Sequence, residues 1–482
     1  MIYLLYFAIK IRQRLVYYTV IKLMSKNMHK IESYADLKKY MRTHPISACW
    51  YGPRSTDVSE LDNLLNIEGV ISCYGSDFPK NQPLLVNDIK GRRQKCSIDD
   101  LAGMLIADGK LPDFIEKNNI TAILPYDSNP ELEKFCETNH ISLFSSPDKL
   151  KDELRDKTKI DDISRAIGLS TIPGIPGIIE DFEFEPLAKR FGLPLFLHFA
   201  EGAGGSGNRI VNTLGEFEKA KTEQRGKRLN AKKYFNGKTC TIDICVTPTA
   251  VICGTLEEEL IGAEPLNSNS TEYVASSWFE NNYSNEIRKR ICEIGVALGE
   301  LLRSRGFMGC FHPDFLVGDN DKIFLTELNM RFGGSCGAYT KIQIAEQQIP
   351  ILAIHTLSFT NPNLRFDAEK INEKNLHPLN YALLVLKNNF RKPITIPCKY
   401  KSGLYSLSGD TIEFIGDTKF ADFKNQDTIL LIGLPDSDKD TVIEEGTFIC
   451  EVMTRFPVSN SKSKLNSEGK ILVEKIFSQL IV

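Results

Sequence analysis

CFHPDFLVGDNDKIFLTELNMRFGG, residues 310–334, is the stretch from which the fold can be argued most directly. Two runs rich in aromatic and branched aliphatic residues flank the turn Gly-Asp-Asn-Asp, whose residue types favour a tight reversal. The pattern therefore predicts a β-hairpin. With an even number of residues in the loop, position 317 pairs with position 322, and Asp314 lies opposite Leu325.

Three oxygen-bearing side chains of this hairpin share one face in that register. Asp314, Glu327 and Asn329 then project together from an otherwise apolar sheet, because side chains alternate faces with a period of two. Burying two carboxylates together without a cation is expensive, and such ligands suit Mg²⁺ (or Mn²⁺). The hairpin thus predicts a metal site. The alternative is that both carboxylates pair with nearby Lys or Arg or face solvent, which a loop of odd length would favour.

A glycine-rich segment, LPLFLHFAEGAGGSGNRIVNT at residues 193–213, carries a second chemical signal. It formally contains G-x-G-x-x-G, but a β-branched, alternating run follows the loop instead of the helix that a dinucleotide site needs. No Gly-Lys-Ser/Thr follows either, so it is not a Walker loop. A glycine-rich hairpin can instead lie over a triphosphate and offer its backbone N–H groups to the phosphate oxygens. A plain glycine-rich turn is the alternative.

The composition is that of a globular protein with ample core. Of 482 residues, 42% are hydrophobic and 25% are charged, and 59 Lys and Arg against 62 Asp and Glu give a net charge of -3. This near-neutrality argues against a nucleic-acid binder, which would need a basic excess. The 12 Cys include no C-x-x-C pair, which indicates reduced thiols in a cytoplasmic protein.

Residues 1–30 form a basic, apolar extension that we exclude from the fold. Their longest apolar run, MIYLLYFAI, is too short to span a bilayer. The basic residues follow that run and no small-residue cleavage site appears, so the order is wrong for a secretory signal. The segment is either a membrane-surface helix or an extension that precedes a true start at Met24 or Met28.

The first predicted domain covers residues 45–150. Apolar runs alternate there with helix-like segments, which predicts a small Rossmann-like parallel sheet covered on both faces. The expected helices lie at 57–66, 97–109 and 129–139.

Two further domains are predicted after residue 150. Residues 151–365 contain a strand-rich lid at about 172–238, a long helix over 285–306 and the hairpin. Residues 366–482 form a β-rich C-terminal domain that ends in a helix. Within it, SNSKSKLNSEG at 459–469 is polar enough to predict a mobile loop.

Taken together, these pieces resemble the ATP-grasp superfamily over about residues 45–340. The resemblance is greatest to the nucleotide-binding core of biotin carboxylase and to the carboxylate–amine ligases built on it. Two more segments carry it: Asp156-Lys157 looks like the family's Asp-Lys pair before the lid, and Lys233-Tyr234-Phe235 looks like its adenine hinge. The resemblance implies an ATP-grasp fold, α/β with an α+β lid, between the Rossmann-like domain and the β-rich C-terminal domain.

The resemblance also implies a set of site residues. Those that would contact the nucleotide are Lys157, His198, the flap residues Gly204, Gly205, Ser206 and Gly207, and the hinge residues Lys233, Tyr234 and Phe235. Asp314, Glu327 and Asn329 would bind the metal ion, and Arg331 would be catalytic. The alternatives are a solvated helix face for Lys157 and a structural ion pair for Arg331.

The chain departs from the family's pattern at three places. His198 stands where a second phosphate-binding Lys is usual, and Lys233 replaces an acidic hinge residue. Residues 254–281 lack the basic, bicarbonate-binding cluster of biotin carboxylases, which argues against the carboxylase activity. His198 either packs in the core or contacts phosphate. In the second case a triphosphate would favour its protonated form, and nucleotide binding would weaken as the pH rises from about 6 to 8.

The implied reaction is an ADP-forming ligation. A carboxylate attacks the γ-phosphoryl group of ATP to give an acyl phosphate, which an amine captures to form an amide or peptide bond. The implied cofactors are ATP and Mg²⁺ (or Mn²⁺), and the implied partners are a small-molecule carboxylate and an amine, with no nucleic acid, no membrane span and a homodimer as the assembly. The alternatives are a nucleotide-binding or regulatory protein that has lost catalysis and a kinase on the same fold.

Overall fold

The computed structural model describes residues 30–481, apart from 62–63, 77–81, 89–90, 201–207, 268–270, 281–282, 410, 418–419, 421–422 and 436. The basic extension, but for its last residue, and the glycine flap therefore lie outside the described residues. In the described part of the chain, none of the helices has the length and apolar character that crossing a membrane requires.

The N-terminal part is a five-stranded parallel sheet with the strand order β4-β3-β2-β6-β7. Its strands are β2 (Ser47–Arg54), β3 (Asn66–Tyr74), β4 (Leu84–Val86), β6 (Ala122–Pro125) and β7 (Ser142–Leu143). Helices α3 (Ile98–Ala107), α4 (Lys110–Lys117) and α5 (Pro130–Thr138) contact it. Ser97 and Asn129 accept backbone N–H bonds at the starts of α3 and α5, two helices that the sequence predicted.

The helix predicted over residues 57–66 is wrong. Strand β2 runs directly into a 3-10 turn, η1 (Ser55–Val58), and the described residues after it form turns. Nε of the buried Arg54 donates to Oδ1 of Asp57 at 2.9 Å, and the same guanidinium pairs with Glu451 from the C-terminal part of the chain. These buried charge pairs fix the backbone at the end of the strand. The apolar side chains that follow, Val58, Leu61, Leu64 and Leu65, are buried in the core although they lie in turns and not in a helix.

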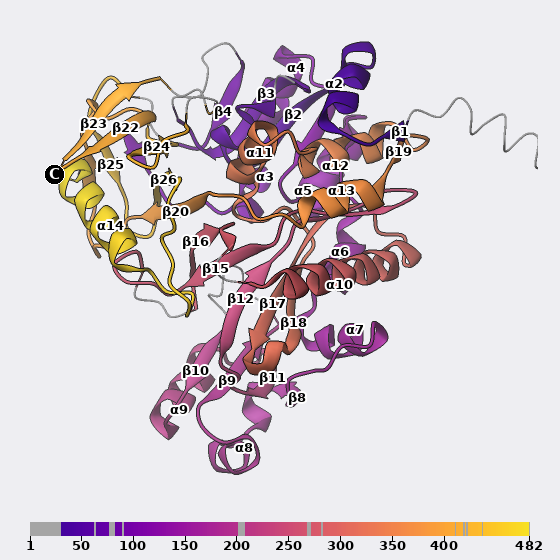
Figure 1. Cartoon of the computed structure of the whole chain (residues 1–482), viewed down its shortest axis with the longest axis vertical. Helices are drawn as coiled ribbons and strands as arrows, with labels where there is room; N and C mark the ends of the chain where they lie inside the picture. Colours follow the sequence, from indigo (N-terminus) through magenta and orange to yellow (C-terminus); the bar gives the residue numbers. More distant parts are fainter. Residues whose placement is uncertain are drawn as a thin grey trace, which may run out of the picture.

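A second, antiparallel sheet has the order β10-β9-β11-β8 and forms the lower part of the molecule in Figure 1. Its strands are β8 (Gly174–Ile178), β9 (Leu195–Phe199), β10 (Arg209–Val211) and β11 (Arg228–Lys233). Helices α8 (Phe184–Phe191) and α9 (Leu214–Glu223) share its separate hydrophobic core. The chain reaches this sheet through α6 (Asp148–Arg155), η3 (Lys157–Lys159) and α7 (Ile160–Ala166).

The largest sheet has the order β14-β13-β17-β12-β15-β16-β20-β26-β24-β22-β23, and β18 also pairs with β17. Its first strands are β12 (Gly237–Thr241), β13 (Ile244–Val246), β14 (Val251–Cys253), β15 (Glu257–Ile261), β16 (Tyr273–Ser277), β17 (Gly309–Gly318) and β18 (Ile323–Asn329). The later ones are β20 (Ala382–Lys387), β22 (Gly403–Ser408), β23 (Thr411–Gly416), β24 (Thr428–Ile432) and β26 (Phe448–Thr454). The pairing of β16 with β20 therefore joins the C-terminal strands to the strands of the hairpin in one sheet (Figure 1).

The remaining elements cover or extend these sheets. The long helix α10 (Asn285–Ser304) packs on β13 and β14, with α12 (Ile351–Thr360) on β13 and β17 and α13 (Ala368–Asn375) on β14. Helix α11 (Cys336–Ala345) contacts η1, and α14 (Ser467–Leu480) contacts β23. Short pairings join β1 (Lys30–Ile31) to β19 (Arg365–Phe366), and β21 (Ile394–Ile396) and β5 (Arg92–Arg93) to β25 (Thr441–Ile443); α2 (Tyr34–Thr43) follows β1.

The hairpin of β17 and β18 is present, but its register differs from the prediction. Val317 pairs with Ile323, so the number of residues between them is odd. A β-bulge next to Asp314 then shifts the pairing by one residue, and Asp314 lies opposite Glu327 instead of Leu325. The bulge thus brings the two carboxylate residues back into register, an effect that the sequence pattern does not reveal.

Candidate active site between two sheets

Side chains from the four-stranded sheet and from the largest sheet line one cavity of about 490 Å³. The predicted site residues that line it are His198, Lys233, Tyr234, Phe235, Asp314, Glu327, Asn329 and Arg331. The flap residues Gly204, Gly205, Ser206 and Gly207 lie outside the described residues. A larger cavity, of about 780 Å³, lies against α2 and α11 and is lined by none of the eight. The smaller cavity is therefore the candidate active site.

The hairpin carboxylates form the polar centre of this cavity. Nδ2 of Asn329 donates to Oδ2 of Asp314 at 3.2 Å, while Oδ1 of Asp314 is buried without a hydrogen-bond partner among the described residues. Burial, and then the charges of Glu259 and Glu327, raise the pKa of Asp314 well above its usual range. A buried carboxylate oxygen without a partner, beside a second carboxylate and an amide, fits a Mg²⁺ ion.

Lys157 lies next to the hairpin carboxylates. Its Nζ is 3.0 Å from Oε1 of Glu327, and its side chain is only 3% exposed. The alternative of a solvated helix face for Lys157 is therefore wrong. Asp156, at the start of η3, accepts bonds from Thr158 and Arg228, which fix the turn that presents Lys157.

Arg331 connects the cavity to the N-terminal sheet. Its Nη1 donates to Oη of Tyr126 at 2.6 Å and to the carbonyl oxygen of Phe332 at 2.8 Å, and its guanidinium lies 5.3 Å from the centre of the Tyr126 ring. Burial opposes its charge, but Tyr126, Asp127 and Glu327 nevertheless raise the pKa of Arg331. Arg331 therefore places a fixed positive charge beside the carboxylates.

His198 lies on β9 opposite Asn230 and is buried. Burial, followed by the charges of Lys157 and Lys232, lowers the pKa of His198 well below 6.5. Lys232 is itself buried, with Nζ 2.8 Å from Oδ1 of Asp161. His198 is thus a buried, neutral ring near two lysines, and its predicted contact with phosphate stays a prediction.

The hinge residues Lys233, Tyr234 and Phe235 connect the two sheets at the cavity wall. The ring of Phe235 packs edge-on against Phe324 with the centroids 4.7 Å apart. Gly318 lies so close to this ring that a Cβ atom there would overlap it. This contact fixes the hinge against the tip of the hairpin.

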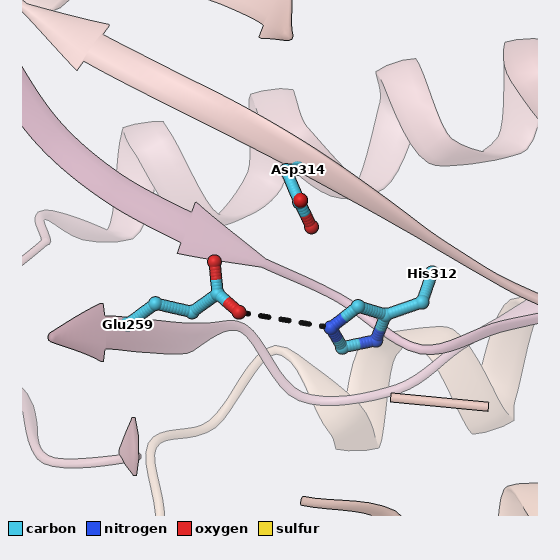
Figure 2. A group of neighbouring side chains, drawn as sticks. All are labelled: Glu259, His312 and Asp314. Atoms are coloured by element: carbon cyan, nitrogen blue, oxygen red, sulfur yellow. Dashed lines mark ion pairs between the residues drawn. The ribbon is translucent and has the colours of Figure 1, made fainter. Parts of the chain in front are cut away.

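Sequence reasoning missed a second polar group in the cavity: Glu257, Glu259 and His312. In Figure 2, His312 and Asp314 of β17 point towards Glu259 of β15, and the ligand atoms of the three residues lie within 4.8 Å of one another. Burial raises the pKa of Glu257 to about 8, and its carboxyl group accepts bonds from Ser276 and Ser335. The sequence did contain a signal for this group. Side chains alternate faces along a strand, so the run Glu257-Glu258-Glu259 puts Glu257 and Glu259 on the same face.

The segment predicted as a mobile loop, 459–469, is part of the site. Oγ of Ser459 donates to Oε2 of Glu258 at 2.7 Å, and Oγ of Ser463 donates to Oε1 at 2.6 Å. Glu258 is buried on the face of β15 opposite Glu257 and Glu259. The prediction is wrong because a buried carboxylate, remote in sequence, holds the segment. Lys462 and Lys464 of this segment line the cavity.

Comparison with known proteins agrees with this architecture. The family model described as carbamoyl-phosphate synthase L chain, ATP binding domain, matches residues 156–248, from the Asp-Lys pair past the hinge. A biotin carboxylase from Campylobacter jejuni, solved as a βγ-ATP complex, aligns over 90% of this chain and 91% of its own, with a TM-score of 0.59 and 15% sequence identity. The chain has the ATP-grasp fold.

The predicted fold class is therefore confirmed. A second ATP-grasp structure, the biotin carboxylase domain dimer of the Hydrogenobacter thermophilus 2-oxoglutarate carboxylase with MgADP, ADP and bicarbonate, aligns over 85% of each chain, with a TM-score of 0.57 and 16% identity. Its ligands agree with the predicted cofactors, ATP and Mg²⁺. The homodimer and the cytoplasmic location stay predictions for this chain.

Pyruvate carboxylase of Bacillus subtilis (strain 168) is 24% identical to this chain over 307 residues. The match covers 58% of this ATP-grasp chain and 25% of that protein, so the chain spans about a quarter of the relative's length. The chain is thus similar in sequence to one part of a carboxylase.

Proposed function

We propose that the chain is an ATP-dependent, ADP-forming ligase that activates a carboxylate as an acyl phosphate and transfers the acyl group to an amine. The observation that carries the proposal is the group of Asp314, Glu327, Asn329 and Arg331 in one cavity between two sheets, with Lys157 paired to Glu327. To catalyse phosphoryl transfer, a protein mainly has to position the reactants and neutralise the charge of the phosphates, and this group of residues can do both.

Different residues would have different roles in the first step, the transfer of the γ-phosphoryl group of ATP to the carboxylate. Asp314, Glu327 and Asn329 would bind Mg²⁺, which would supply positive charge to offset that of the nucleotide phosphates. Lys157, which pairs with Glu327 in this structure, would turn to the nucleotide phosphates. Lys233, Tyr234 and Phe235 would hold the base by backbone hydrogen bonds. The contact of Phe235 with Phe324 holds the hinge against the hairpin during this step.

Arg331 is positioned to orient the carboxylate that attacks the γ-phosphoryl group. A planar guanidinium can donate two parallel hydrogen bonds to a carboxylate or to an acyl phosphate. The bonds from Arg331 to Tyr126 and to the carbonyl oxygen of Phe332 fix the plane of the guanidinium before substrate binds. Closure of the two sheets around the cavity would exclude water, which otherwise hydrolyses the acyl phosphate.

The wall formed by β15 supports an amine as the acceptor. Glu257 and Glu259 face the cavity at the place where the sequence lacks a basic cluster. With a pKa raised to about 8, Glu257 is largely protonated at neutral pH, so Glu259 is the group that, as a carboxylate, would attract a cationic amine, accept its proton and repel an anion. This wall therefore favours an amine of positive charge over a second anionic substrate.

A second candidate is the carboxylation of an amine by bicarbonate. The structural similarity to biotin carboxylases favours it, and the first step would be the same, because carboxyphosphate is also an acyl phosphate. Against it stand residues 254–281, which offer carboxyl groups where those enzymes are expected to have basic ones. The two candidates therefore differ only in the carboxylate that is activated.

An ADP-release assay with purified protein and MgATP distinguishes the candidates. Pools of amino acids and small acids, each with and without bicarbonate, serve as substrates, and Glu327→Ala serves as the control for contaminating ATPases. ADP release that requires a pool acid and an amine supports the ligase, and ADP release with incorporation of labelled bicarbonate supports carboxylation. ADP release with a stable phosphorylated product would establish a kinase instead. Tight ATP binding without turnover in any pool would favour the regulatory alternative.

A further inference from the structure

We propose that Glu259, His312 and Asp314 bind a divalent transition-metal ion of the kind that accepts imidazole, such as Zn²⁺ or Co²⁺. One nitrogen and two carboxylate oxygens from two strands of the largest sheet converge there, all within 4.8 Å of one another (Figure 2). This site differs from the magnesium site of the proposed function, which consists of oxygen ligands alone. It shares Asp314 with that site and adds two residues for which the proposed function has no metal role.

The imidazole of His312 is oriented as in known metal sites. Its Nδ1 lies 2.8 Å from Oδ1 of Asp243, and both side chains are buried. A carboxylate that holds one ring nitrogen fixes the tautomer and directs the other nitrogen to a metal ion. In this protein the other nitrogen, Nε2, points into the cavity towards Glu259.

The distances fit a metal ion better than a direct hydrogen bond. Nε2 of His312 is 4.0 Å from Oε1 of Glu259, which is beyond hydrogen-bond distance. Metal–ligand bonds of about 2.1 Å put neighbouring ligand atoms of a tetrahedral ion about 3.4 Å apart. Ligand atoms that lie within 4.8 Å of one another are therefore close to the spacing that three ligands of one such ion need.

The local charge also calls for a cation. Asp243, Glu259 and Asp314 lie around His312, and Oδ1 of Asp314 is buried without a hydrogen-bond partner among the described residues. Lys157 pairs with Glu327, and Arg331 offsets part of the charge of Glu327 and Asp314. A divalent ion between Glu259 and His312 would add positive charge next to Glu259, and imidazole and carboxylate together suit ions such as Zn²⁺.

The test measures metal binding in the absence of turnover, so its failure is separate from failure of the proposed function. Full-length protein that carries Cys398→Ser, which removes an exposed thiol, is stripped with a chelator and dialysed against Zn²⁺ in excess Mg²⁺. Elemental analysis should find one Zn²⁺ per chain. Replacement of Zn²⁺ by Co²⁺ should give a visible absorption spectrum of nitrogen and oxygen coordination.

Matched variants then assign the ligands. In the same background, His312→Gln and Glu259→Gln should each lose the stoichiometric Zn²⁺, and Asp243→Asn should weaken binding about 10- to 100-fold. His377→Gln, which changes an exposed histidine, should keep it. Circular dichroism identifies a misfolded variant, and the two ligand variants are independent of each other. Absence of stoichiometric Zn²⁺ in the parent protein, or its retention in both folded ligand variants, would overturn the proposal.

Discussion

Replacement of Ser463 by alanine should open the segment that carries Lys462 and Lys464. The hydroxyl group of Ser463 donates to the buried carboxylate of Glu258 at 2.6 Å. A hydrogen bond to a charged group contributes about 1.5–3 kcal/mol, and here its loss would leave one carboxylate oxygen with fewer partners. Because about 1.4 kcal/mol corresponds to a factor of ten, the open population of the segment should rise about 10- to 100-fold.

Limited digestion with trypsin measures this opening, since Lys462 and Lys464 are cleavage sites within the segment. When opening is faster than cleavage, the cleavage rate follows the open population. Ser463→Ala should therefore be cut about 10- to 100-fold faster at these two sites, with other sites unaffected.

The matched control is Ser478→Ala. Ser478 lies on the exposed face of α14, and its hydroxyl group donates to the backbone carbonyl of Lys475. This variant should be cut at the wild-type rate. A cleavage rate of Ser463→Ala within twofold of the wild-type rate would show that the bond to Glu258 does not hold the segment closed.

Three further predictions concern the cavity. Glu327→Ala should lower turnover about 1000-fold or more with an unchanged circular dichroism spectrum, because it removes a proposed metal ligand; near wild-type rates would contradict that role. Lys157→Met should weaken ATP binding about 10- to 100-fold by fluorescence titration, whereas Lys159→Met on the exposed side of the same turn should not, and equal affinities would refute the phosphate contact. Burial, Lys157 and Lys232 lower the pKa of His198 in the folded protein, so the unfolded chain binds a proton at this residue more readily. The protein should therefore lose stability as the pH falls below about 6.5, the pKa of histidine in an unfolded chain. His198→Gln should reduce that loss in urea unfolding at pH 5 relative to pH 7, and an unchanged pH profile would count against it.

Local signals in the sequence were sufficient for much of the fold. Helix α5 follows from its Asn129 cap and its apolar spacing, and the β17–β18 hairpin follows from two apolar runs around a turn. The resemblance to the ATP-grasp family then indicated how these pieces assemble. Each of these signals comes from a segment of about 30 residues or fewer. Over that length, hydrophobic periodicity and turn-forming residues predict secondary structure well.

The failures share a physical cause, which is contact between remote residues. Arg54 contacts Glu451 and so favours a 3-10 turn over the predicted helix, and Ser463 contacts Glu258 and so fixes the predicted mobile loop. No local pattern reports a partner about 200 or more positions away. The bulge at Asp314 is likewise a property of the paired strands and not of one strand.

If a carboxylate is activated as an acyl phosphate at Asp314, Glu327 and Asn329, an oxygen atom of that carboxylate must pass to the released phosphate, and an isotope label follows this transfer. The substrate carboxylate identified by ADP release is labelled with ¹⁸O and turned over with MgATP. An acyl phosphate that is captured by an amine leaves one labelled oxygen in the released phosphate. The products should be ADP and phosphate that carries one ¹⁸O atom per turnover. Unlabelled phosphate, or AMP with pyrophosphate as the products, would contradict it.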